Sequence, residues 1–441
     1  MNIKQAKEEL KNSIRAYLLK DAAGAYVMED VRRRPLLLMG PPGIGKTAIM
    51  EQIAEELNIN LVSYTITHHT RQSAIGLPVV SQRIYGGKEY TVTDYTMSEI
   101  VASVYDRIEE SGNPEGILFL DEINCVSETL MPTMLQFLQY KTFGTHKVPG
   151  GFVIVCAGNP AKYNRAVRDF DIVTLDRLRR FDIEEDYGAW KEYASERRIH
   201  GSILAFLDIK KDCFYSVRPD VEEMRFVTAR GWEDLSATVS VYEKLGMAVT
   251  EGVVGGFLQD KEIASAFALY YELYRKYHED FKIDDILAGT LKEGDLKMQK
   301  APFDEKLSLL HLLFDAVDND FYEYDLFYEK QLERFEELKR RRAALDGAAA
   351  QTADTIDAYR ADAAAFAPAE QDRMAKIEEI QEKLKHVFLF IDRTFGEGQE
   401  MVIFLTSLSS GFYSKKFLHE CGSVEYDKYS SVLLLNERKS A

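Results

Sequence analysis

A glycine-rich stretch near the start of the sequence constrains the fold more than any other feature. A short apolar run at residues 36–39 is followed by GPPGIGKT, and then by the apolar residues Ile49, Ile53 and Leu57 at fourfold spacing. This order of buried strand, glycine loop and amphipathic helix is the context in which the pattern G-x-x-x-x-G-K-T binds phosphates. We therefore predict an α/β domain with a parallel sheet and a nucleotide site at this strand-to-helix turn.

The predicted phosphate loop holds the residues that would bind the phosphates of ATP. They are Gly40, Pro41, Pro42, Gly43, Ile44, Gly45, Lys46 and Thr47. Glycine lets the backbone wrap so that several N–H groups point at the β-phosphate, which lies on the positive end of the following helix. Lys46 would reach the β- and γ-phosphates, and the Thr47 hydroxyl would hold Mg²⁺.

Two adjacent carboxylates end the next apolar run, EGILFLDEIN. At the carboxyl end of a parallel strand they lie where ligands bind in open sheets. Asp121 would act on the metal through its water shell, and Glu122 would activate the water that attacks the γ-phosphate. Because a kinase has no use for such a glutamate, the pair favours hydrolysis. Capping of the following helix would explain only one of the two carboxylates.

A third apolar run, GFVIVCAGNP, ends in Asn159. We expect this strand to lie between the two strands that carry the phosphate loop and the acidic pair. The Asn159 amide would then orient the attacking water or contact the γ-phosphate. Taken alone, the Asn-Pro dipeptide is equally well explained as a turn.

Taken in order, the phosphate loop and the motifs LFLDE, AGNP, LDRL and TARGW resemble those of AAA+ ATPases, and within them the MoxR group, a dynein-related AAA subfamily. The resemblance covers about residues 30–245. It implies an AAA+ sheet domain with a helical lid and a β-hairpin inserted into the second helix. Residues 77–95 fit that hairpin, because residues alternate on either side of Gly86-Gly87, a two-residue turn.

The resemblance also implies roles for two arginines. In this family an arginine near the end of a strand that follows the asparagine motif enters the adjacent subunit's site and neutralises charge on the γ-phosphoryl group. The register of TLDRLRRF favours Arg177, with Arg180 as the alternative. The alternative to a role in the neighbouring site is that these arginines, Arg179 above all, pair with the acidic residues 184–186 on the solvent-exposed surface. Arg230 in VTARGW would contact the nucleotide of its own subunit from the lid, although a surface arginine at a helix start is common.

We expect three parts along the chain: the α/β domain at 1–190, a helical lid and extension at 191–300, and a helical region at 301–441. Within 321–392, apolar residues at three-and-four spacing predict two long helices that form an antiparallel coiled-coil hairpin. These helices would either project as a docking arm or pack back as an ordinary bundle.

Composition narrows the class of protein further. Acidic residues outnumber basic ones 72 to 55, and a net charge of −17 repels nucleic-acid phosphates unless a local basic patch overrides it. The four cysteines are far apart, which is typical of reduced thiols in the cytoplasm. The amino-terminal segment has no apolar core, and no apolar run approaches the length of a membrane span. We treat His68 and His69 as interface or substrate contacts and not as metal ligands.

These observations predict an ATP-hydrolysing remodelling ATPase that acts as a ring, a hexamer by resemblance, because its site lacks an arginine without the neighbouring subunit. The resemblance further implies a separate partner protein with a von Willebrand factor A domain, and a protein client that is matured or activated. Two alternatives stay open. One is a nucleic-acid-associated NTPase motor of the restriction type, which could use GTP. The other is a nucleotide-gated scaffold that does not hydrolyse.

Overall fold

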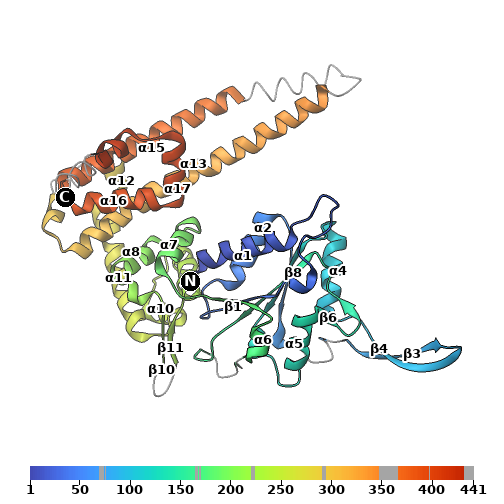
Figure 1. Ribbon diagram of the computed structural model, residues 1–441. Coiled ribbons are helices and arrows are strands. Elements are labelled where there is room, and N and C mark those ends of the chain that lie inside the picture. The colour runs from blue at the N-terminus through green and yellow to red at the C-terminus, as the bar shows by residue number, and fades with distance from the viewer. Residues whose placement is uncertain are drawn as a thin grey trace. The chain divides into compact units, whose positions relative to one another are not determined.

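The computed structural model describes residues 1–68, 74, 76–163, 167, 170–219, 224–290, 295–346, 366–396 and 398–431 (Figure 1). The chain divides into two compact units, each described here by itself. The first comprises Met1–Trp190 with Tyr215–Gly231, and the second comprises Lys191–Phe214 with Trp232–Ala441. Residues 215–231, which lie within the segment predicted as lid and extension, therefore group with the first unit.

A parallel sheet of five strands forms the centre of the first unit, in the order β2-β5-β8-β1-β9. The strands are β1 (Leu36–Met39), β2 (Asn60–Thr65), β5 (Gly116–Asp121), β8 (Phe152–Gly158) and β9 (Arg179–Asp182). Strands β1 and β8 are buried along their whole length, as the continuous apolar runs of the sequence indicate. The prediction of a parallel sheet with β8 between β5 and β1 is confirmed.

Helices cover both faces of this sheet because alternate residues of each strand point to opposite sides. Leu36 and Leu38 of β1 pack with α1 (Ile3–Leu18) and α2 (Lys46–Leu57). Leu37 packs on the other face, with α4 (Glu99–Ser111) and α5 (Met131–Tyr140). Asn2 and Gln5 start α1 with a capping box, in which each side chain accepts a bond from the other residue's backbone N–H.

Smaller elements complete the first unit. They are η1 (Asp30–Arg32), η2 (Ile66–His68), β3 (Pro78–Tyr85), β4 (Lys88–Tyr95), η3 (Ile123–Cys125), β6 (Thr142–Phe143), β7 (His146–Lys147), α6 (Ile172–Leu175), β10 (Ser216–Pro219) and β11 (Met224–Val227). Strands β3 and β4 form an antiparallel hairpin around Gly86 and Gly87. Both glycines have positive φ, 58° and 79°, which a tight two-residue turn requires.

The second unit is built mainly of helices. They are α8 (Gly201–Ile209), η4 (Lys211–Cys213), α10 (Glu251–Phe257), α11 (Lys261–Phe281), α12 (Ile283–Leu287), η5 (Asp295–Lys300), α13 (Phe303–Asp346), α15 (Phe366–Phe395), α16 (Gln399–Ser410) and α17 (Phe412–Cys421). Helices α7 (Tyr187–Glu196) and α9 (Ala229–Leu245) begin in the first unit and end in the second. The predicted helical carboxyl-terminal region is confirmed.

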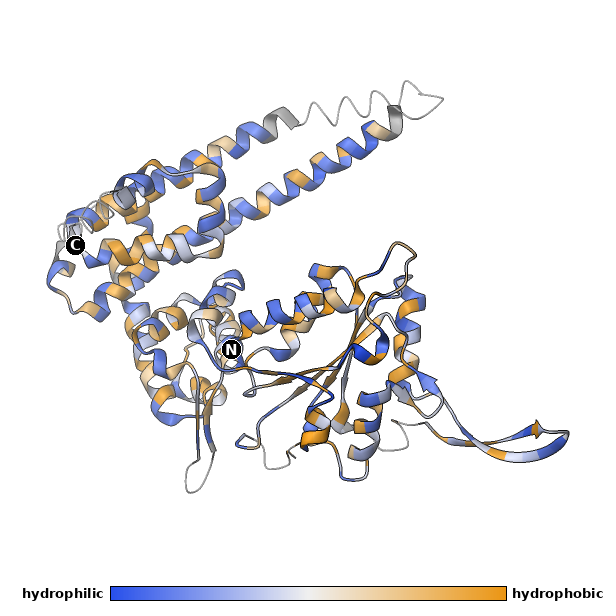
Figure 2. Cartoon of the chain, viewed as in Figure 1, coloured by the Kyte–Doolittle hydropathy of each residue, from blue (hydrophilic) through white to orange (hydrophobic). Residues whose placement is uncertain are grey.

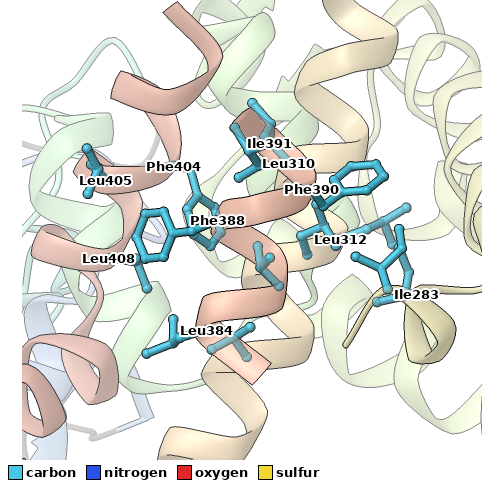
Figure 3. Close-up of a cluster of buried hydrophobic side chains, with 14 of the residues drawn as sticks. Ile283, Leu310, Leu312, Leu384, Phe388, Phe390, Ile391, Phe404, Leu405 and Leu408 are labelled. Atoms are coloured by element: carbon cyan, nitrogen blue, oxygen red, sulfur yellow. The ribbon is translucent and has the colours of Figure 1, made fainter. Parts of the chain in front are cut away.

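The core of the second unit lies where α13, α15 and α16 meet (Figure 3). Phe388 of α15 is fully buried and packs edge-on against Phe404 of α16, with ring centroids 5.4 Å apart. The Phe388 ring also stacks on the ring of Tyr429, with centroids 5.1 Å apart. Such aromatic pairs add to the free energy gained by burial, so this cluster contributes to the stability of the unit.

The two long helices α13 and α15 run antiparallel. Asp320 of α13 accepts a bond from Lys383 of α15 at 2.9 Å, and further along Tyr324 accepts one from Arg373 at 3.2 Å. Apolar residues of α13 recur beyond this pairing (Figure 2), where Leu332 and Phe335 are 44% and 42% exposed. The proximal parts of the helices thus pack into the bundle, while the distal part of α13 exposes apolar side chains. The segment 347–365 between them lies outside the described residues.

Candidate nucleotide site

The phosphate loop connects β1 to α2, as predicted, and two of its glycines have left-handed backbones. Gly43 has φ 70° and Gly45 has φ 94°, in the region that residues with a side chain rarely adopt. A Cβ on Gly43 would also lie 2.9 Å from Thr228, at the start of α9. The loop conformation therefore depends on glycine at both positions.

Lys46 begins α2 and is only 8% exposed. Its ammonium donates three hydrogen bonds, to Gly40 O at 2.9 Å, Pro41 O at 2.7 Å and Asn159 Oδ1 at 2.8 Å. Burial lowers the pKa of Lys46 to about 8, against the attraction of Asp121 and with help from the positive charge of Arg230. A triphosphate would have to draw the ammonium away from these neutral oxygens, and its negative charge would restore the lysine pKa.

Thr47 and Asp121 lie together at the carboxyl edge of the sheet. The Thr47 hydroxyl donates to Asp121 Oδ2 at 3.3 Å, and Asp121 Oδ1 accepts from the backbone N–H of Glu122 at 2.8 Å. One hydroxyl and one carboxylate beside a phosphate loop are a donor set that suits Mg²⁺, which takes few protein oxygens and completes its octahedron with phosphate and water. Among the residues that the structure describes, there is no group of three or more His, Cys, Asp or Glu side chains that could hold a metal ion.

Glu122 follows β5 in a left-handed conformation, with φ 56° and ψ 34°. Its Oε2 accepts a hydrogen bond from the Thr67 hydroxyl at 2.8 Å. Strand β2, which Thr67 follows, is the neighbour of β5 with Thr65 opposite Asp121, so the register of the sheet brings the two side chains together. Sequence reasoning missed Thr67. The only signal for it was a hydroxyl residue just after a predicted strand.

The site contains two asparagines. Asn159 follows β8 and accepts from Lys46, while its backbone carbonyl accepts from the Asn124 amide at 2.8 Å. The predicted group of Lys46, Thr47, Asp121, Glu122 and Asn159 is therefore brought to one edge of the sheet. Asn124 stands within the quoted DEIN motif, but no role was predicted for it.

Arg230 lies beside the phosphate loop of its own chain. Its backbone N–H donates to Gly43 O at 3.2 Å, and the nearby Tyr215 hydroxyl donates to Pro42 O at 3.0 Å. The side chain of Arg230 is exposed, and its charge is close enough to depress the pKa of Lys46. Tyr215 and Arg230 thus contact the loop on its backbone oxygens.

The three arginines of TLDRLRRF have different surroundings. Arg179 donates to Ser13 at 2.7 Å and pairs with Glu9 at 3.3 Å, while Arg180 donates to Asp182 at 2.7 Å. The alternative that these arginines pair with the acidic residues 184–186 is therefore wrong for Arg179 and Arg180, because Arg179 lies beside α1 and Arg180 beside Asp182. Unlike Arg179 and Arg180, Arg177 does not lie on β9 but in the exposed turn between α6 and β9. Within the described part of the chain, no acceptor is hydrogen-bonded to its guanidinium, which interacts with Asp171 by its charge alone.

Comparison with known families agrees with this geometry. Residues 36–181 match the model of the ATPase family associated with various cellular activities (AAA). The match covers about a third of the chain and supports an AAA+ ATPase. A search of curated proteins gave no match. AAA domains bind nucleotide, usually with Mg²⁺, and generally hydrolyse ATP, so the match supports an ATP-hydrolysing activity.

The matched region begins at β1 and ends in β9. It contains every predicted site residue except Arg230, the arginine expected from the lid. Of the histidine pair, His68 ends η2, and His69 lies outside the described residues. Among the helices that the structure describes, none has both the length and the apolar character needed to cross a membrane.

Proposed function

We propose that this chain is a remodelling ATPase of the MoxR type, which hydrolyses ATP at a site completed by an arginine of a neighbouring copy. One observation carries the proposal. A lysine, a hydroxyl, two carboxylates and an amide converge at the carboxyl edge of the AAA sheet, while Arg177 stands exposed in a turn away from them.

Each residue of the edge has a defined task. The backbone of Gly40 to Gly45 cradles the β-phosphate, and Lys46 bridges to the γ-phosphate. Thr47 and Asp121 would hold Mg²⁺, which when bound draws charge from the phosphate oxygens. Asn159, released by Lys46, orients the attacking water.

Glu122 accepts a proton from that water as it attacks. In the chain alone, Thr67 occupies one oxygen of this carboxylate. Release of the Thr67 bond frees that oxygen for the water, so the state of this bond governs the basal rate.

Arg177 acts on the adjacent copy in this proposal. A guanidinium that neutralises the developing γ-phosphoryl charge contributes about 10³-fold or more to the rate. Arg180 and Arg179 are less suited, because each is held by an acid of its own chain. A closed ring, a hexamer as in the resembling family, gives every site such a neighbour.

The client and partner follow from the resemblance to the MoxR group. We place the chain in the cytoplasm, with a separate von Willebrand factor A domain protein as partner and a protein complex as client. The exposed Leu332 and Phe335 on α13 are available for such docking. Two observations disfavour the alternatives: the net charge of −17 opposes a nucleic-acid motor, and Glu122 is superfluous in a scaffold that does not hydrolyse.

Mixing of variants tests the shared site. Arg177→Ala and Glu122→Gln are each expected to bind ATP but to lose turnover. Mixed subunits should recover part of it, because an Arg177→Ala subunit keeps its own glutamate and receives the arginine of its neighbour. Arg180→Ala and Arg179→Ala serve as matched controls and should retain turnover. Absence of recovery, or full turnover by dilute monomers, would contradict the proposal.

A further inference from the structure

Asn124 is a buried polar side chain that the proposed mechanism does not use. It lies in η3, two residues after Glu122, and is 1% exposed. The turn closes with a bond from Cys125 N–H to Glu122 O at 2.9 Å. Because β8 is the neighbour of β5 in the sheet, this turn places Asn124 against the end of β8.

The Asn124 amide makes an incomplete set of hydrogen bonds. Its Nδ2 donates to the backbone carbonyl of Asn159 at 2.8 Å, whereas its Oδ1 is buried with no partner among the described residues. Leaving a buried amide oxygen without a partner costs free energy. What this amide contributes is therefore its one donor bond, to the Asn159 carbonyl.

The backbone at the end of β8 is shaped around this amide. A Cβ on Gly158 would lie 2.6 Å from Asn124 Oδ1, so the strand accommodates Asn124 only with glycine at that position. Asn159 follows directly. Its carbonyl is held by Asn124 and its side-chain Oδ1 by Lys46 at 2.8 Å. When a triphosphate takes Lys46, the bond from Asn124 still holds the Asn159 carbonyl, while the Gly40 N–H holds the preceding carbonyl of Gly158 at 3.3 Å.

We infer that Asn124 is a positioning residue for the Asn159 amide, and through that amide for the attacking water. Asn124 itself contacts neither water nor phosphate in this arrangement. The inference rests on the proposed hydrolytic function. A displacement of about 1 Å in a positioned group can lower a rate by about 10²-fold, so loss of the Asn124 bond is expected to reduce kcat at least tenfold.

Steady-state kinetics of Asn124→Ala and of the shape-matched Asn124→Asp, which has no hydrogen to donate when ionised, test this role. Both variants should lose kcat with KM changed less than about threefold, because binding depends on the phosphate loop. The control is Asn60→Ala. Asn60 is also buried, and its Nδ2 donates to Asn113 O at 2.7 Å at the opposite end of the sheet, so its loss should lower the melting temperature but not kcat.

A double-mutant comparison separates positioning from an independent effect. In the Asn159→Ala background the side chain to be positioned is gone, so adding Asn124→Ala should cause no further loss of kcat. An unchanged kcat in both Asn124 variants, or a loss that multiplies with that of Asn159→Ala, overturns the inference while leaving the proposed function intact. A wild-type chain without ATPase activity refutes the proposed function, and the inference falls with it.

Discussion

Nucleotide affinity is expected to fall about tenfold between pH 7 and pH 9, because Lys46 loses its charge in that range. Burial lowers the pKa of the free lysine to about 8. With that value, about nine-tenths of the ammonium is charged at pH 7 and about one-tenth at pH 9. A bound triphosphate favours the charged form and raises the lysine pKa. Binding therefore takes up protons and weakens as pH rises through the free value.

Isothermal titration calorimetry with MgATP measures this effect directly, using Glu122→Gln to prevent turnover. Repeating the titration in buffers of different ionisation enthalpy counts the protons taken up, with about half a proton expected at pH 8. Lys46→Arg is the matched control, because a guanidinium stays charged over this pH range. The nucleotide affinity of this variant should be weaker than that of the wild type but constant with pH. Wild-type affinity that stays constant from pH 7 to pH 9 would refute the reasoning.

Two further predictions concern single side chains. Thr67→Val removes the exposed hydroxyl that holds Glu122. The lost hydrogen bond is worth about 1 kcal/mol, so basal kcat should rise roughly fivefold, whereas Thr67→Ser, which keeps the hydroxyl, should leave it unchanged. An unchanged rate in the valine variant would show that the bond does not restrain the carboxylate. Phe388→Ala should destabilise the second unit by about 3–5 kcal/mol without changing nucleotide affinity, while Leu332→Ala, at an exposed position, should have little effect on thermal unfolding. Equal melting temperatures for these two variants would contradict the assignment of the core.

The strands at the site could be predicted because each is a separate apolar run that ends in a polar residue. β1, β5 and β8 end at the loop, at the acidic pair and at Asn159, and parallel strands bring those ends to one edge. The pattern gave no comparable signal for Thr67 or Asn124. Their contacts depend on which strands are neighbours and on the register between them, and neither property is encoded in local spacing.

The surroundings of the arginines show the same limit. The sequence does not distinguish the surroundings of three arginines that lie within four positions, and it suggested only acidic partners close by in the chain. In the fold, Arg179 pairs with Glu9 of α1, because α1 packs beside the edge strand β9. An ion pair between residues distant in sequence forms only once tertiary packing has brought their elements together.

The sequence by itself determined the parallel sheet, the phosphate loop with its acidic pair, and the helical carboxyl-terminal region, because hydrophobic periodicity and glycine placement act over a few residues. Only the tertiary structure decided that Thr67 holds Glu122, that Asn124 holds Asn159, and that Tyr215 and Arg230 contact the phosphate loop. Those contacts join segments far apart in the chain, and their geometry is set by sheet register and packing, which no local pattern contains.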